Sequence, residues 1–280
     1  MTDPSSSPAR HRRAIVGGRG RLADLVADAS PSDTCIYAPE GVGFGTDGRS
    51  ARSFRVERLG GLIADMRSRD VGELVLAGAM RRPRLELEQM DRFTRTAMTR
   101  LAPAMRAGDD TLLRTVISIF EEEGFRVLPA QEAAPALLPE TGLLSRARPS
   151  PQDEEDATRG FEVLRLIGAA DIGQSLAVAQ GQVLAVEAGP GTDWMLDTLS
   201  GDVPGRPEPH DGRGVLCKAP KPGQDRRVDL PVIGPKTVRA AARAGLAGLA
   251  VEAGGVMVLD RSEVTEAADE VGLFVWVRAS

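Results

Sequence analysis

Short apolar runs that alternate with segments of helical spacing limit the fold of this chain more than any other feature of its sequence. In the N-terminal half, strand-like runs and helix-like segments follow one another at residues 13–18, 21–29, 34–40, 59–70, 73–80 and 111–125. Strands that alternate with helices in this way form a parallel sheet with crossover helices. The pattern therefore predicts a Rossmann-like domain at residues 13–139, preceded by a disordered tail at residues 1–12.

A second α/β domain is expected at residues 153–280, after a linker at 140–152 that is rich in Pro, Ser and acidic residues. Ser150, followed by Pro151 and Asp153, has the pattern of a helix N-terminus. The remaining patterns predict a hairpin at 175–189 that turns at Gly181, a helix from Lys236, strands at 248–255, 256–260 and 273–277, and a helix capped by Asp260. The expected fold class is thus two mixed α/β domains, the first Rossmann-like, joined by a linker.

Net charge and cysteine usage restrict the classes of partner. A net charge of -5 and a pI near 5.3 argue against a protein that coats nucleic acid or an anionic membrane through bulk charge. No apolar run reaches membrane-spanning length. The two cysteines, Cys35 and Cys217, are far apart and have no metal-binding spacing. We expect a cytoplasmic protein without a nucleic-acid partner, in which any site for an anion is local.

The scarcity of histidine limits the chemistry of a site. The two histidines, His11 and His210, both lie in polar stretches that resemble a tail and a loop. If the chain is an enzyme, carboxylates, lysines and arginines must therefore carry its chemistry.

The pentapeptide "AVEAG" occurs twice, at residues 185–189 and 250–254. Each copy places a glutamate, Glu187 or Glu252, at the end of an apolar strand. Open α/β sheets bind ligands at strand ends, so both glutamates are candidate site residues. The alternative is that this sequence is a common way to leave a strand. Shortly after the first copy, Thr192 or Asp193 is expected to cap the next helix.

In the N-terminal half, two turns follow predicted strands and suit an anionic ligand. Gly17 and Gly18 lie between a strand and a helix, where backbone N–H groups receive phosphate. A plain tight turn is the alternative, and the third glycine of the dinucleotide fingerprint is absent. After the strand at 73–80, Arg81 and Arg82 suit phosphate oxygens, although a solvated basic turn explains them equally well. Asp109 is expected to be a helix N-cap.

The stretch "LCKAPKPGQDRRVDLPVIGPKT", residues 216–237, concentrates charges and prolines. Its cations suit phosphate oxygens, and its carboxylates suit Mg²⁺, which prefers one or two carboxylates together with phosphate oxygens. The prolines restrict the backbone and would hold the charged side chains in place. The alternative is a surface turn on which the charges neutralise one another. The residues concerned are Lys218, Lys221, Asp225, Arg226 and Asp229.

The segments "VLAGAMRRP", "GDDTLLRTV", "AADIGQSLAV", "AVEAGPGTDWML", "KAPKPGQDRRVDLPVIGPKTV" and "GLAGLAVEAGGVMVLD" closely resemble the UDP-2,3-diacylglucosamine pyrophosphatase family of lipid A biosynthesis. This is the alphaproteobacterial type, which is unrelated to the calcineurin-like enzymes. The resemblance covers residues 15–277, and "KPGQD" is its most specific part. It implies a Mg²⁺-dependent hydrolase with two α/β domains that hold the acylated sugar between them.

The implied reaction cleaves the diphosphate of UDP-2,3-diacylglucosamine to UMP and 2,3-diacylglucosamine 1-phosphate (lipid X), with water attacking the β-phosphorus. The catalytic aspartate of the family falls in "GQD", which here is Asp225. We expect Asp225 either to bind Mg²⁺ or to orient the water. Asp193, Asp229 and Glu187 are candidate second carboxylates, the first two as metal ligands. Lys218, Lys221 and Arg226 would hold the diphosphate, with further substrate contacts from Gly17, Gly18, Arg81, Arg82, Glu187, Thr192, Gln224 and Glu252.

Two other functions remain open at this stage. A non-catalytic protein that binds a nucleotide-sugar lipid would bind tightly without metal-dependent turnover. A nicotinamide-dependent oxidoreductase would use the N-terminal glycine turn, and the missing third glycine counts against it. For the hydrolase we expect transient contact with the inner-membrane surface. The sequence leaves the oligomeric state open, a homodimer included.

Overall fold

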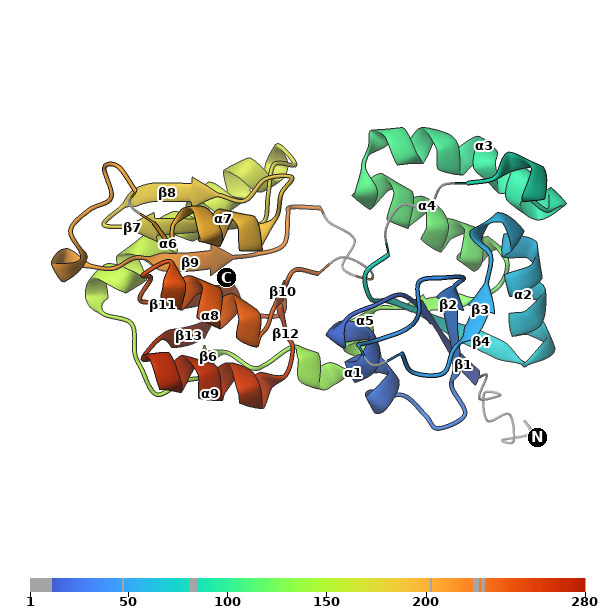
Figure 1. The fold of residues 1–280 in the computed structure, drawn as a ribbon, viewed down its shortest axis with the longest axis horizontal. Helices are drawn as coiled ribbons and strands as arrows, with labels where there is room; N and C mark the ends of the chain where they lie inside the picture. The colour runs from blue at the N-terminus through green and yellow to red at the C-terminus, as the bar shows by residue number, and fades with distance from the viewer. Residues whose placement is uncertain are drawn as a thin grey trace, which may run out of the picture. The chain divides into compact units, whose positions relative to one another are not determined.

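The computed structural model describes residues 12–46, 48–80, 85–201, 203–223, 227 and 230–279, without the side chains of Asp109, Asp110 and Asp211. The chain separates into two compact units, Met1–Pro135 and Ala136–Ser280, both of mixed α/β structure (Figure 1). The predicted fold class is thereby confirmed. Residues Gly142–Leu143, within the stretch expected to be a linker, form a strand of the second unit.

The first unit contains a five-stranded sheet in the order β3-β2-β1-β4-β5, and every pairing is parallel. This order reverses between β1 and β4, as in the Rossmann fold, and so confirms the prediction for this domain. Because the middle of β1 is covered on both faces of the sheet, its residues Ala14–Val16 are all buried and apolar, without polar alternation. The strands are β1 Arg12–Gly17, β2 Cys35–Pro39, β3 Arg52–Phe54, β4 Val71–Ala77 and β5 Arg126–Leu128.

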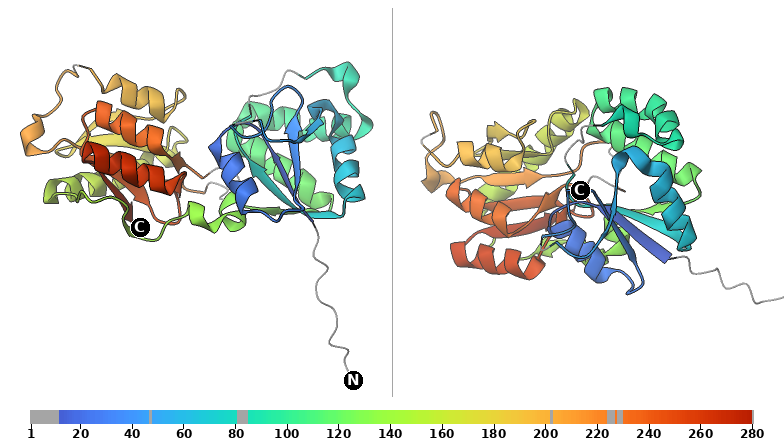
Figure 2. Two further views of the ribbon diagram at one scale, coloured as in Figure 1. Left: turned by 60° about the horizontal axis from the view of Figure 1, so that its bottom comes forward. Right: turned by 45° about the vertical axis from the view of Figure 1, so that its right-hand side comes forward.

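Helices α1 Arg21–Ala29, α2 Leu59–Ser68, α3 Arg92–Ala107 and α4 Asp109–Glu122 lie between these strands in the chain, and α5 Ala130–Ala133 follows β5. Helix α3 was not predicted; its N-cap is Asp91, whose side chain accepts a hydrogen bond from the Thr94 N–H at 2.7 Å. It packs beside α4 (Figure 2), and Leu101 and Ile119 belong to the apolar cluster between them. The prediction that Asp109 is an N-cap is wrong, because α4 already includes Asp109 and its N-cap is Gly108.

The second unit contains a six-stranded mixed sheet in the order β6-β13-β11-β9-β7-β8. Strands β9, β11 and β13 are parallel, whereas β7 is antiparallel to both β9 and β8. Strand β8 therefore points in the same direction as β9, β11 and β13. Its strands are β6 Gly142–Leu143, β7 Ser175–Ala179, β8 Gln182–Val186, β9 Val215–Lys218, β11 Gly248–Glu252 and β13 Phe274–Arg278. Two further strands, β10 Val232–Ile233 and β12 Met257–Val258, form a separate parallel pair.

Helix α6 Pro151–Ala169 covers one face of this sheet, and α7 Thr192–Thr198, α8 Pro235–Arg243 and α9 Arg261–Val271 cover the other (Figure 1). The predicted start of α6 is confirmed by a capping box in which Ser150 and Asp153 bond each other's backbone N–H groups. The hairpin turns at Gln180 and Gly181, both with positive φ, as expected. Asp260 stands at the N-cap of α9, although its side chain makes no capping hydrogen bond.

Helix α7 differs from the prediction at its first turn. It begins at Thr192, and its N-cap is Gly191, so neither Thr192 nor Asp193 is the cap. The Thr192 hydroxyl is thereby available for partners outside the helix. None of the helices in the described part of the chain is long and apolar enough to cross a membrane.

Candidate active site

Several strands of the second sheet place polar residues at one edge. The carboxyl ends of β8, β9 and β11 meet there, together with the amino end of β7. Ser175, the first residue of β7, is the register partner of Lys218, the last residue of β9. Glu187 follows β8, and its N–H donates to the Ser175 carbonyl at 2.9 Å. Glu252 ends β11. The expectation that both "AVEAG" glutamates lie at strand ends is therefore met.

Four side chains at this edge form one hydrogen-bonded group, the Lys218 cluster, which consists of Ser175, Glu187, Thr192 and Lys218. Lys218 Nζ donates to Thr192 Oγ1 at 2.7 Å, and Thr192 Oγ1 donates to Glu187 Oε2 at 2.9 Å. Ser175 Oγ donates to the same Glu187 oxygen. Ser175 is fully buried, and Lys218 and Glu187 are 5% and 9% exposed. The cluster is thus a charged group held inside the protein.

Burial sets the electrostatics of Lys218. Removal from water lowers the pKa of its ammonium below the ordinary value, and the Glu187 and Asp193 carboxylates oppose this by favouring the charged form. An ammonium has three N–H donors, and the described residues supply one acceptor, Thr192 Oγ1. The described residues therefore leave two donors for a ligand. Such a desolvated cation binds phosphate oxygens more strongly than a cation in water does.

The other predicted residues of this edge lie outside the Lys218 cluster. Lys221 Nζ pairs with Asp171 Oδ1 at 2.7 Å. Glu252 is next to Gly255, because a Cβ at Gly255 would lie 2.7 Å from Glu252 Oε1. Leu216 packs on the α7 and α8 side of the sheet and Ala250 on the α6 side. Since side chains alternate along strands, Lys218 belongs to the first side and Glu252 to the second.

Part of the predicted site lies outside the described residues, namely Arg81, Arg82, Gln224, Asp225, Arg226 and Asp229. Their assigned roles remain predictions. Asp193 is described and exposed, and its charge acts on Lys218. Within the described residues, no group of three or more His, Cys, Asp or Glu side chains could hold a metal ion.

The glycine turn of the first unit lies at the point where its strand order reverses. Gly17 ends β1 beside the end of β4, and a Cβ there would lie 1.9 Å from the Ala77 carbonyl oxygen. A Cβ at Gly18 would lie 2.1 Å from the Ala79 carbonyl oxygen. These contacts explain why both residues are glycine without any ligand. Contact of Gly17 and Gly18 with substrate remains a prediction, favoured by their place at the reversal point.

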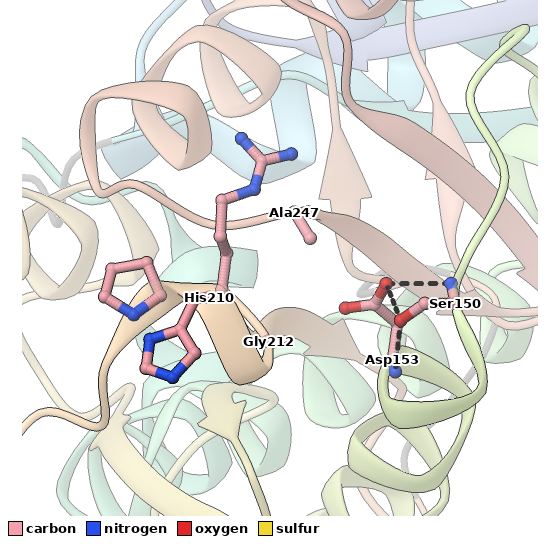
Figure 3. Close-up of a pocket in the computed structure, with 7 residues that line it drawn as sticks. Ser150, Asp153, His210, Gly212 and Ala247 are labelled. Carbon is pink, nitrogen blue, oxygen red and sulfur yellow. Dashed lines mark hydrogen bonds between the residues drawn. The ribbon is translucent and has the colours of Figure 1, made fainter.

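A hollow of about 250 Å³ lies at the opposite edge of the second sheet (Figure 3). It is lined by the start of α6, by residues before β9 and by Ala247 before β11. Figure 3 shows Asp153 bonded to Ser150 at its margin and His210 across from it. No predicted site residue lines this hollow, so it is separate from the Lys218 cluster.

Two residues of this edge were not predicted. Ser175 begins the apolar run "SLAVA", and only its register with Lys218 reveals its place. Gln174 precedes it, and its Oε1 atom is buried with no hydrogen-bond partner in the described structure. The polar pair Gln174 and Ser175 at the start of an apolar run was the feature of the sequence that could have indicated these two residues. The segment "ADIGQS" carries that signal between α6 and β7.

Comparisons with known proteins agree with the two-unit organisation. The family model described as the LpxI N-terminal domain matches residues 12–137, and the one described as the LpxI C-terminal domain matches residues 140–276. A curated protein of Caulobacter vibrioides, described as "UDP-2,3-diacylglucosamine pyrophosphatase LpxI", is 42% identical over 224 residues. The match covers 79% of this chain and 79% of that protein.

Proposed function

The chain belongs to the LpxI family, and we propose that it hydrolyses the diphosphate of UDP-2,3-diacylglucosamine to UMP and lipid X. The observation that carries this proposal is the 42% identity, over 79% of both chains, to a protein described as that pyrophosphatase. The Lys218 cluster supports it, because a buried ammonium to which the described residues offer a single acceptor suits a diphosphate.

In the proposed reaction, the oxygen of a water molecule forms a bond to the β-phosphorus. The bond from that phosphorus to the bridging oxygen breaks, and UMP leaves with the bridging oxygen. The water oxygen remains in the phosphate of lipid X, and the protons of the water pass to solvent or to product phosphate. Negative charge increases on the leaving oxygen during this step, so positive groups that contact it lower the barrier.

Lys218 is proposed to donate to oxygens of the diphosphate, oriented by Thr192 and Glu187. Lys221 and Arg226 would hold the remaining phosphate charge, while Asp225 orients the attacking water or binds a metal. Gln224 and Glu252 would also contact the substrate, and contact of the substrate with Gly17, Gly18, Arg81 and Arg82 remains a prediction. The role of Asp225 is the one that the resemblance to the family implies. The role of Lys218 is supported by its place at the end of β9, and those of the other residues by their chemistry.

Mg²⁺ dependence is a further part of the proposal. Mg²⁺ usually takes one or two carboxylates together with phosphate oxygens and water, so the absence of a three-carboxylate group among the described residues is compatible with it. The charge of Asp193 acts on Lys218, which makes Asp193 a candidate oxygen ligand for the ion. Asp225 and Asp229 would supply the other carboxylate ligands. When bound, the ion supplies positive charge to the phosphate oxygens.

Release of UMP from purified UDP-2,3-diacylglucosamine tests the proposal, measured with Mg²⁺ and then with excess chelator. We expect release with Mg²⁺, none with chelator, and a loss of orders of magnitude in Asp225→Ala. Release that persists in chelator would remove the metal from the proposal. Tight lipid binding without any release would favour the alternative of a non-catalytic carrier. We also propose that the protein works in the cytoplasm and touches the inner membrane transiently, which co-sedimentation with lipid vesicles tests.

A further inference from the structure

We propose that Ser175 is a positioning residue, whose hydroxyl fixes the Glu187 carboxylate so that Glu187 and Thr192 aim the Lys218 ammonium at the phosphate oxygens of the substrate. This inference rests on the proposed function and adds a residue to it. Ser175 touches neither substrate nor metal in this account. It acts through two neighbours.

The hydrogen bonds of Thr192 link the orientation of the Lys218 ammonium to the position of the Glu187 carboxylate. Thr192 has one hydroxyl proton, which it donates to Glu187 Oε2 at 2.9 Å. Its oxygen is then an acceptor for Lys218 Nζ, at 2.7 Å. The orientation of the Thr192 hydroxyl, and hence of the ammonium, therefore depends on where Glu187 Oε2 lies. Ser175 Oγ is the second donor to that oxygen, and it also lies 3.4 Å from Thr192 Oγ1.

The Glu187 carboxylate has only a weak intrinsic preference for one orientation. The last torsion of a glutamate side chain is broad and roughly two-fold, so hydrogen bonds must select its angle. With both hydroxyls in place, Glu187 Oε2 is bonded from Ser175 on β7 and from Thr192 on α7. Without Ser175, one donor remains, and Glu187 and Thr192 can turn together. Lys218 would then lose its fixed direction.

The backbone around Ser175 is shaped for this contact. A Cβ at Gly173 would lie 1.9 Å from the Glu187 carbonyl oxygen, so only glycine lets the chain before β7 approach Glu187 so closely. The Glu187 N–H then bonds the Ser175 carbonyl at 2.9 Å. Ser175 is 0% exposed, and a buried hydroxyl needs a hydrogen-bond partner. An alanine would fill nearly the same volume without this requirement, which makes Ser175→Ala a mild change to packing.

A double-mutant cycle tests the proposal through turnover. Ser175→Ala, Thr192→Val and the double variant are compared with the wild type for kcat and KM in UMP release. We expect Ser175→Ala to lower kcat/KM roughly ten-fold, mainly through kcat, because a misaligned donor weakens transition-state contacts. In the Thr192→Val background the link to Lys218 is already broken, so Ser175→Ala should change kcat/KM less than about two-fold.

The chain offers matched controls at the end of α7. Thr198 Oγ1 donates to the Met195 carbonyl and Ser200 Oγ to the Asp197 carbonyl, so neither reaches the cluster. Thr198→Val and Ser200→Ala should keep wild-type kinetics. If Ser175→Ala does not fold, Ser175→Cys replaces it, since the thiol retains the approximate size and is only a weak donor.

The outcomes separate this inference from the proposed function. A wild type that releases no UMP removes both. Suppose instead that the wild type is active and that Ser175→Ala lowers kcat/KM by the same factor in the wild-type and in the Thr192→Val background. The two effects are then independent, and only the positioning role is removed. An active wild type whose kinetics Ser175→Ala leaves unchanged also removes the positioning role alone.

Discussion

Lys218 donates a 2.7 Å hydrogen bond to the Thr192 hydroxyl, so among the described residues its ammonium is held by a neutral oxygen and not by a direct ion pair. The Glu187 carboxylate lies one hydrogen bond further away, on the other side of Thr192. A lysine whose charge is fully neutralised by a carboxylate would offer less to a phosphate. Held through a hydroxyl, Lys218 keeps its charge for an anionic ligand while its position is fixed.

Replacement of Lys218 by an apolar side chain should disable the site. Lys218→Met retains much of the side-chain volume but removes every donor that residue 218 offers to the diphosphate. We expect kcat/KM for UMP release to fall by about 10²–10³, as for the loss of one strong oxyanion donor. Lys236→Met, on the exposed first turn of α8, is the matched control and should stay near wild type. Activity within a few-fold of wild type in Lys218→Met would exclude Lys218 from the reaction.

Replacement of the Glu187 carboxylate by an amide should change the pH dependence. Burial lowers the pKa of Lys218, and Glu187 opposes that shift. Glu187→Gln removes the opposing charge, so the pKa of Lys218 falls further. The proposed active form of Lys218 is the ammonium. The alkaline decline of kcat/KM should therefore begin at a lower pH in Glu187→Gln than in the wild type.

The pH profile of kcat/KM measures this effect. Glu208→Gln is the control, because Glu208 is exposed and the hydrogen bond that it accepts from Gln180 goes to its backbone carbonyl. The control should keep the wild-type profile. An alkaline limb that stays in place in Glu187→Gln would mean that Glu187 does not influence the group that titrates there.

Periodicity and strand ends predicted most of the fold and the edge that carries the site. The position of Glu187 at a strand end followed from an apolar run that stops at a charged residue. Lys218, by contrast, was expected in a rigid loop, and strand β9, which it ends, was not predicted. The partners of Thr192 did not follow, because capping is a local rule, whereas its hydroxyl bonds residues 5 and 26 positions away in the chain. Ser175 was missed for the same reason, since its partner is 12 residues away and the antiparallel pairing of β7 with β8 brings them together.

Helix α3 shows a different limit of prediction. Its buried residues, Ala97, Leu101 and Ala104, have helical spacing. The signal is weak because the buried residues are small apart from Leu101 and because Pro103 lies inside the helix, where proline usually breaks it. Packing against α4 supplies the stabilisation that the local sequence lacks.

The contact between α6 and β9 beneath the site gives a prediction about stability. Alanine is normally more favourable than glycine inside a helix, by roughly 1 kcal/mol. At Gly160 of α6, however, a Cβ would lie 2.3 Å from Cys217 Sγ on β9. Gly160→Ala should therefore lower the free energy of unfolding by about 1–3 kcal/mol, because Cys217 is fully buried and has no room to move.

Chemical denaturation of purified variants measures this free energy. Gly61→Ala in α2 is the matched control, since its Cβ would meet nothing closer than 3.9 Å, and it should be neutral or stabilising. Removal of the clashing sulfur in Gly160→Ala with Cys217→Ala should recover part of the loss beyond the effect of Cys217→Ala alone. If Gly160→Ala is as stable as the wild type, α6 and β9 pack less closely than these distances require.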